Sequence, residues 1–314
     1  MNMTTTRVED RSLGLGIDVG GTKVALGLVT VDGTLLSTAH VYNREAGNAA
    51  QLLTLVASAA RQLAHVGGPN RLVGVGLGMP EVVDLERNIR TASVVPWQRE
   101  AIETELSELG PVVVEADVRA AAIAEAQVGA GRPYTRFCYV TIGTGISYTL
   151  VRDHRPDAGT HGAAQSLGTG RIAVRCPKCS SLSGVVLEDV TSGPAIVAHF
   201  NQRTGHQFKG TEEVVAAAEA GDQAALEILE ESAHIAGSFV AFMVNLVDPE
   251  AVVVGGGLGC SGGLWWDHLV RSIRDHIWPD YIKDISICTA ALGPWAGVVG
   301  AGLCAIQELT SVQA

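Results

Sequence analysis

The run Leu13-Gly14-Leu15-Gly16-Ile17-Asp18-Val19-Gly20-Gly21-Thr22-Lys23-Val24 decides the fold of this chain. An apolar strand ends in two glycines, whose small size lets backbone N–H groups approach a phosphate. Thr22 adds a hydroxyl donor, and Asp18 supplies a carboxylate at which Mg²⁺ could bind. Gly-Gly between apolar runs is also an ordinary hairpin turn, and both interpretations fit, because residues 24–31 continue as a second strand.

Neither of the two commonest nucleotide motifs is present in this stretch. No Gly-Lys-Ser/Thr ends the loop, and no G-x-G-x-x-G opens a helix. The pattern therefore favours the actin-like type of phosphate-binding architecture, and it predicts a protein that handles a nucleotide triphosphate.

The composition is that of a globular protein with room for two domains. The chain has 314 residues, of which 47% are hydrophobic and 18% charged. Its 33 acidic and 22 basic residues give a net charge of −11, which disfavours nucleic acid and anionic membranes as partners. The polar residues 1–12 are expected to form a flexible tail, not a signal peptide. Because the six cysteines lie mostly in apolar runs, we expect reduced thiols and a cytoplasmic location.

The strand, glycine turn and strand of the opening run occur a second time. Residues 137–142 and 146–152 are expected strands that flank the turn Gly143-Thr144-Gly145. A later buried strand, 251–254, ends in Gly255-Gly256-Gly257. This duplication predicts two similar α/β domains with a cleft between them. Residues 153–183 show no clear period and are expected to form a functional loop.

One carboxylate follows an expected strand directly. The strand 112–114 leads through Glu115 and Ala116 to Asp117, and an alanine-rich helix follows over 118–128. Asp is a common residue at a helix N-terminus, where its side chain accepts from backbone N–H groups. Asp117 could also be a general base, because phosphoryl transfer to an alcohol needs a base close to the hydroxyl.

The chain resembles the ROK group of sugar kinases and repressors, which lies within the actin-like ATPase superfamily. The resemblance implies an α/β fold of two actin-like (ribonuclease H-like) domains with the active site in the cleft between them. Residues 13–116 would form the N-terminal domain, completed by the C-terminal helix 296–310, and residues 117–295 the second domain. Four blocks carry the match: Gly16-Ile-Asp-Val-Gly-Gly-Thr-Lys23, Gly74-Val-Gly-Leu-Gly-Met-Pro80, Val140-Thr-Ile-Gly-Thr-Gly145 and Val253-Val-Gly-Gly-Gly257.

The resemblance also implies ATP and Mg²⁺ as cofactors, with Asp18 at the metal and Asp117 as the catalytic base. One phosphate-binding turn would be Gly20-Gly21-Thr22-Lys23 and the other Gly143-Thr144-Gly145, while Gly255-Gly256-Gly257 would pack against adenosine. Members are commonly homodimers, so a homodimer is expected here.

The acceptor site departs from the family pattern. Ala116 stands where the family usually has Asn, Glu81 follows Pro80 in place of Gly, and Ser166 and Thr169 replace the Glu and His of a Glu-x-Gly-His run. Asp117 and Glu188 match the residues that the family usually has at these positions of the acceptor site. Each lost hydrogen bond costs roughly 1–3 kcal/mol, so a substrate other than plain glucose is expected. We expect phosphorylation of a primary hydroxyl, equivalent to O6 of a hexose, on an aminosugar such as kanosamine or on a C7-cyclitol.

Several of these positions have two interpretations. Glu81 could pair with a substrate ammonium group or be a solvated turn residue, and His161 could contact the substrate or simply face solvent. Cys176 and Cys179 form half of a zinc site, but Thr169 and Val186 stand where the family has its other ligands. A retained zinc ion and two free thiols both remain open.

Three other functions compete with a sugar-like kinase. A repressor would carry a helix-turn-helix before the phosphate loop, for which no room is left before Asp18. A catalytically silent binding protein would not need Asp117. The sequence does not exclude a kinase for plain glucose or for another acceptor, such as an N-acyl hexosamine or fructose.

Overall fold

The computed structural model describes residues 12–67, 71–175 and 178–312, and the chain divides into two compact units. Unit 1 comprises residues 1–124 and 295–314, and unit 2 comprises residues 125–294. The division falls inside helix α3 (Asp117–Val128), between Ala124 and Glu125. The first turns of α3 belong to unit 1 because they pack on the C-terminal helix: a Cβ on Gly300 would lie 1.7 Å from the Ala120 carbonyl oxygen.

Unit 1 is built on a five-stranded sheet in the order β3-β2-β1-β4-β5. The first three strands form an antiparallel meander, and β4 and β5 continue the sheet in parallel with β1. The strands are β1 (Ser12–Val19), β2 (Lys23–Thr30), β3 (Leu35–Tyr42), β4 (Arg71–Met79) and β5 (Val112–Ala116).

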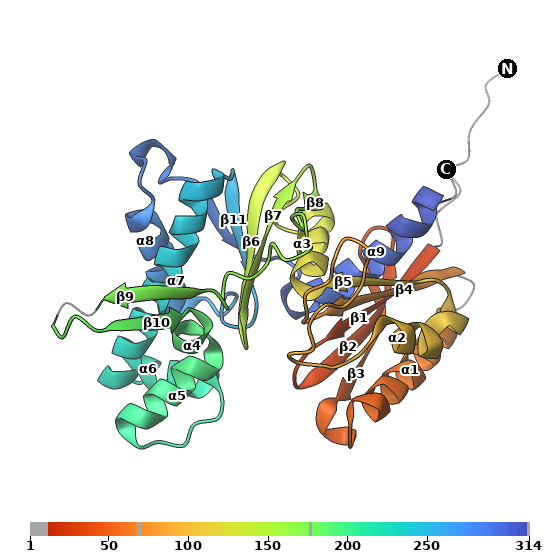
Figure 1. Ribbon diagram of the computed structural model, residues 1–314, viewed down its shortest axis with the longest axis horizontal. Coiled ribbons are helices and arrows are strands. Elements are labelled where there is room, and N and C mark those ends of the chain that lie inside the picture. The colour runs from red at the N-terminus through yellow and green to blue at the C-terminus, as the bar shows by residue number, and fades with distance from the viewer. Residues whose placement is uncertain (1–11, 68–70, 176–177, 313–314) are drawn as a thin grey trace. The chain divides into compact units, whose positions relative to one another are not determined.

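The two faces of this sheet carry different helices, as Figure 1 shows. Side chains alternate along a strand, so the large residues Leu15 and Ile17 join the core of α1 (Ala49–Val66) and α2 (Arg99–Leu106). The opposite face presents glycines to α9 (Ala296–Val312). A Cβ on Gly16 would lie 1.9 Å from the Val298 carbonyl oxygen, so only glycine permits this close packing.

Unit 2 repeats this topology. Its sheet has the order β12-β11-β6-β7-β8, with β6, β7 and β8 antiparallel and β6, β11 and β12 parallel. The predicted duplication is therefore confirmed strand by strand. The strands are β6 (Arg136–Ile142), β7 (Ile146–Arg152), β8 (Arg155–Pro156), β11 (Ala251–Gly255) and β12 (Ser286–Thr289).

Unit 2 also contains helices α4 to α8, and N-cap residues in the sequence mark where two of them begin. Helix α5 begins after the N-cap Ser192, and α7 begins after Asp222, whose side chain accepts from the Ala225 N–H. Phe200 and Trp265 are fully buried in the core of this unit. The helices are α4 (Glu188–Thr191), α5 (Gly193–Thr204), α6 (Thr211–Glu219), α7 (Gln223–Val247) and α8 (Gly263–His276). Among the described residues of both units there are also short 3-10 helices: η1 (Asn43–Glu45), η2 (Ser107–Leu109), η3 (Asp280–Ile282) and η4 (Gly293–Trp295).

The stretch 153–183, expected to be a loop, contains strands. Besides β8, it holds β9 (Arg171–Arg175), which pairs with β10 (Leu182–Val186) in a two-stranded antiparallel sheet. The alternation in Arg171-Ile-Ala-Val-Arg175 was the available signal, and the surrounding Gly, Pro and Ser residues obscured it. Across the described ranges, none of the helices is both long and apolar enough to cross a membrane.

Candidate active site

The glycine turn at the end of β1 is closed and supported from a neighbouring strand. The Gly20 N–H donates to the Lys23 carbonyl at 3.0 Å, which leaves Gly21, Thr22 and Lys23 exposed at the tip. Asn43 lies just after β3, and its Nδ2 donates to the carbonyls of Gly20 and Gly21 at 3.1 and 2.8 Å. The supporting role of Asn43 was not predicted from the sequence, because Asn43 lies more than 20 residues after the turn that it contacts.

Asp18 lies where a cation would be stabilised. It is partly buried near the end of β1, on the face toward α9, and a Cβ on Gly297 in the first turn of α9 would lie 2.7 Å from its carboxylate oxygens. Burial raises the pKa of Asp18 to about 6, while Lys23 acts in the opposite direction. A carboxylate beside a phosphate-type turn is a suitable ligand for Mg²⁺.

Asp117 is the first residue of α3 and lies close to Asp18. A Cβ on Gly78 would lie 3.4 Å from the Asp117 Cα and 3.5 Å from the Asp18 Oδ1, so this glycine separates the two acids. The Asp117 Oδ1 accepts from the N–H of Val118, the next residue, at 2.6 Å. Burial and then the charge of Asp18 raise the pKa of Asp117 to about 7. A carboxylate with such a pKa can take up a proton near neutral pH.

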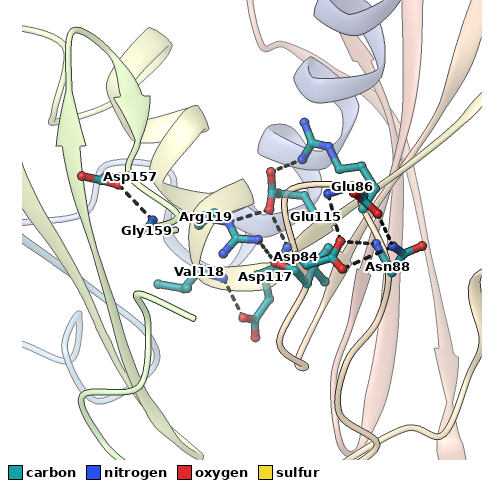
Figure 2. A network of polar contacts seen from close by, with 12 residues as sticks. Asp84, Glu86, Asn88, Glu115, Asp117, Val118, Arg119, Asp157 and Gly159 are labelled. Atoms are coloured by element: carbon teal, nitrogen blue, oxygen red, sulfur yellow. Dashed lines mark hydrogen bonds and ion pairs between the residues drawn. The ribbon is translucent and has the colours of Figure 1, made fainter. Parts of the chain in front are cut away.

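Behind Asp117 lies an ion-pair network that the sequence analysis missed. Arg119 Nε donates to Glu115 Oε1 at 2.6 Å, and Arg119 is only 2% exposed. The other oxygen of Glu115 pairs with Arg87. Figure 2 shows the Asp117 side chain pointing away from the Glu115–Arg119 pair, which leaves its carboxylate outside this network.

Glu81 is a buried loop anchor in this structure. It is 2% exposed, and its carboxylate accepts from the Thr91 hydroxyl and from the N–H groups of Ser93, Val94 and Val95. Burial works to raise the pKa of Glu81, but these hydrogen bonds outweigh it and leave the pKa lowered. Four donors from its own loop favour an anchoring role over either alternative considered from sequence, a solvated turn residue or a partner for an ammonium group.

In unit 2 the glycine turn after β6 is fixed to the helices that follow. The Gly143 N–H donates to the Gly145 carbonyl at 3.0 Å, and the Gly193 N–H at the start of α5 donates to the Gly143 carbonyl at 2.8 Å. Glu188 accepts from the Ile146 N–H at 2.8 Å, so its carboxylate supports this turn. Gly256 has a φ of +82°, and a Cβ there would lie 2.4 Å from the Ile142 carbonyl oxygen, which explains glycine at this position.

A pocket of about 780 Å³ opens beside this turn. It is lined by Gly143, Thr144 and Gly257 from the predicted nucleotide turns, and by the first residues of α5 and α6. A Cβ on Gly257 would meet no atom within 4 Å, so this residue leaves open space. The volume suits a nucleoside.

For the remaining predicted site residues, the structure gives mainly their exposure to solvent. His161, Ser166 and Thr169 are exposed, Pro80 is partly buried, and Ala116 is fully buried. Cys176 lies outside the described residues, and Cys179 is exposed, with its Sγ 3.0 Å from the Ser181 hydroxyl. Within the described ranges, no three His, Cys, Asp or Glu side chains are grouped so that they could hold a metal ion.

The chain is similar to known sugar kinases over nearly its full length. It is 30% identical to the glucokinase of Streptomyces coelicolor over 309 residues, which cover 92% of this chain and 96% of that protein. It is 28% identical over 255 residues to the kanosamine kinase of Amycolatopsis mediterranei, covering 79% and 81% of the two chains.

A solved structure gives the same result. The ROK family glucokinase of Streptomyces griseus, in complex with glucose and AMPPNP, superposes with a TM-score of 0.81 at 28% identity, covering 94% of this chain and 99% of that one. This match confirms the two-domain actin-like fold. The family pattern of ROK proteins matches residues 14–308, and the chain belongs to the ROK family.

Proposed function

We propose that this protein is an ATP-dependent kinase that phosphorylates a primary hydroxyl of a hexose-like substrate, with Asp117 as the general base. The observation that carries the proposal is the pair of desolvated acids, Asp18 and Asp117, on either side of Gly78. Family membership and the similarity to glucokinases support the class of reaction.

Asp117 would accept the proton of the attacking hydroxyl as the oxygen–phosphorus bond forms. Because its pKa is about 7, it is ionised over much of the neutral range and is a stronger base than an ordinary aspartate. Its carboxylate is oriented by the Val118 N–H. Most of the rate would come from holding the hydroxyl in line with the terminal phosphate.

Asp18 is the side chain that would hold Mg²⁺, and a bound Mg²⁺ would offset the negative charge of the phosphates. Its desolvated carboxylate fits this role. Gly20, Gly21, Thr22 and Lys23 would contact phosphate oxygens through backbone N–H groups, the hydroxyl and the ammonium group. Asn43 keeps that turn in shape by binding its carbonyls.

The pocket of unit 2 would hold the nucleoside part of ATP. Gly143, Thr144 and Gly257 line it, and Gly145 shares the turn that Glu188 supports. Gly255 and Gly256 precede Gly257 in the same turn, and a Cβ on Gly255 would lie 2.2 Å from the Tyr139 hydroxyl oxygen. We therefore assign Glu188 to the support of the nucleotide turn ahead of a direct contact with the sugar.

For the acceptor we propose an aminosugar such as kanosamine, or a C7-cyclitol. Ala116 is buried and apolar and cannot bind a sugar hydroxyl, which supports a departure from glucose. Ser166, Thr169 and His161 are exposed and available to a ligand. Plain glucose is the second candidate, because the similarity to the Streptomyces coelicolor glucokinase spans 92% of the chain.

A coupled assay with ATP and Mg²⁺ over glucose, kanosamine and valiolone-type cyclitols tests this function. We expect ADP release with kanosamine or a cyclitol to exceed that with glucose, and the phosphate to be found by NMR on the primary hydroxyl. A clear preference for glucose would end the altered-acceptor proposal but keep the kinase. Absence of transfer to every acceptor would contradict the kinase itself.

Zinc on Cys176 and Cys179 and a homodimer remain proposals from the family resemblance. Metal analysis of the purified protein decides the first, with one zinc per chain expected if the pair binds it and none if both are free thiols. Light scattering decides the second.

A further inference from the structure

The loop from Glu81 to Val95 begins shortly after Gly78, at the site of the two acids, and is held by carboxylates of its own. Glu81 accepts four hydrogen bonds at one end of the loop. Asp84 accepts from the N–H groups of Glu86 and Asn88, both at 2.9 Å, and pairs with Arg90 at 2.9 Å. The loop is thus a preformed structure, and Figure 2 shows Asp84, Glu86 and Asn88 gathered in it.

Arg87 at the tip of this loop adopts an unfavourable backbone conformation. Its φ is +67°, in the left-handed region that non-glycine residues rarely occupy. Such strain persists only where surrounding contacts impose it. The guanidinium of Arg87 reaches two carboxylates outside the loop: it pairs with Glu115 on β5, and its Nη2 lies 3.2 Å from the Glu308 Oε2 on α9.

Glu115 connects this contact to the strand end that carries Asp117. It accepts from Arg119 on its other oxygen, and Arg119 Nη2 donates to the Val83 carbonyl of the loop at 2.7 Å. Arg87 and Arg119 therefore join the loop twice to the junction of β5 and α3. Burying ion pairs is costly and adds little stability compared with apolar packing, so stability alone does not account for this network.

We propose that Arg87 is a positioning residue: it latches the loop 81–95 to the strand end bearing Asp117, and so fixes where the acceptor hydroxyl lies relative to that carboxylate. This inference rests on the proposed kinase function. We expect the contact to act more on the acceptor than on the nucleoside, because the pocket assigned to the nucleoside is formed by residues of unit 2.

The test compares R87A with R61A. Arg61 is a matched control, because it is a partly exposed arginine of unit 1 that also pairs with two carboxylates, those of Glu105 and Glu108. Removing Arg87 leaves Glu115 paired with Arg119, so the fold is expected to survive. For the acceptor that wild type phosphorylates faster, glucose or kanosamine, we expect R87A to raise the KM about tenfold, with the KM for ATP changed less than about twofold. R61A should change neither, and R87K should recover part of the loss.

Amide hydrogen exchange provides a readout that needs no activity. Exchange in residues 82–95 should be faster in R87A than in wild type or R61A. If R87A does not fold, R87K carries the test, with a smaller rise in KM and faster exchange in the same segment. Wild type that phosphorylates nothing refutes the proposed function, whereas active enzyme in which R87A and R61A behave alike refutes the latch.

Discussion

The two units share one strand order but differ in the side chains at equivalent strand ends. Two residues before the glycine turn, unit 1 has Asp18 and unit 2 has Thr141. The last strand of the sheet is followed by Asp117 in unit 1 and by Ala290 in unit 2. Unit 2 has instead the large pocket lined by glycines and helix N-termini. Under the proposed function, the duplicated scaffold would separate two tasks, with proton transfer in unit 1 and nucleoside binding in unit 2.

The largest expected effect comes from removing the acid of unit 1. D117N should lower kcat by roughly 10²–10⁴, because an amide cannot accept the proton of the attacking hydroxyl. D32N is the matched control, since Asp32 is an exposed turn residue of the same unit, and it should retain full activity. Steady-state ADP release measures both variants. A D117N enzyme as fast as D32N would break the assignment of chemistry to unit 1.

Filling the pocket of unit 2 should affect the nucleotide alone. The Cβ of G257V would meet no atom within 4 Å, and we expect this variant to raise the KM for ATP roughly 10–100-fold. G184V, on the exposed strand β10, is the control, and it should leave the KM for ATP unchanged. If G257V raised the KM for the acceptor instead, the pocket would not be the nucleoside site.

The acidity of Asp117 predicts the pH dependence of the reaction. The base must be ionised, so kcat/KM should fall as pH decreases through about 7, by about tenfold for each further pH unit. Because Asp18 and Asp117 interact, the acid limb reports apparent pKa values of the pair. An acid limb near pH 4 in a profile over pH 4–9 would show that neither acid is desolvated in the working enzyme.

A smaller effect is expected on stability without ligands. The pKa of Asp18 is raised in the folded state from 3.8 to about 6, so the folded protein holds the proton more tightly than the unfolded chain does. The free energy of unfolding should therefore fall as pH rises from about 4 to about 6. At pH 8, D18N should be more stable than wild type by roughly 1–2 kcal/mol, a reduced figure because the side chain is partly exposed. Urea denaturation at pH 4 and 8 measures this, and equal stability at pH 8 would count against a desolvated Asp18.

Much of the fold was predictable because local patterns agree with it. The two glycine turns, their flanking strands and the alanine-rich helix after Asp117 follow directly from local sequence patterns. The β9–β10 sheet was missed because glycine and serine residues obscured a short alternation. The role of Gly16 was also hidden: its absent side chain admits helix α9, a segment almost 300 residues away in sequence.

The candidate site was predictable only in its glycines and carboxylates. Asp18 and Asp117 stand out at strand ends, and the structure brings them to one place. Asn43, Arg87 and Arg119 could not be identified, because their partners are set by tertiary contacts between separate strands and loops. Glu81 was recognised as unusual, but the four donors that surround it come from residues 91–95, which only the folded loop brings near.

The most direct test of the division between the units is a paired measurement on D117N and G257V: the Kd for AMPPNP and the rate of a single turnover at saturating ATP. We predict that D117N keeps the wild-type Kd and loses the rate, while G257V loses affinity and keeps the rate. Loss of both quantities in either variant, or the reverse assignment, would contradict separate tasks in the two units.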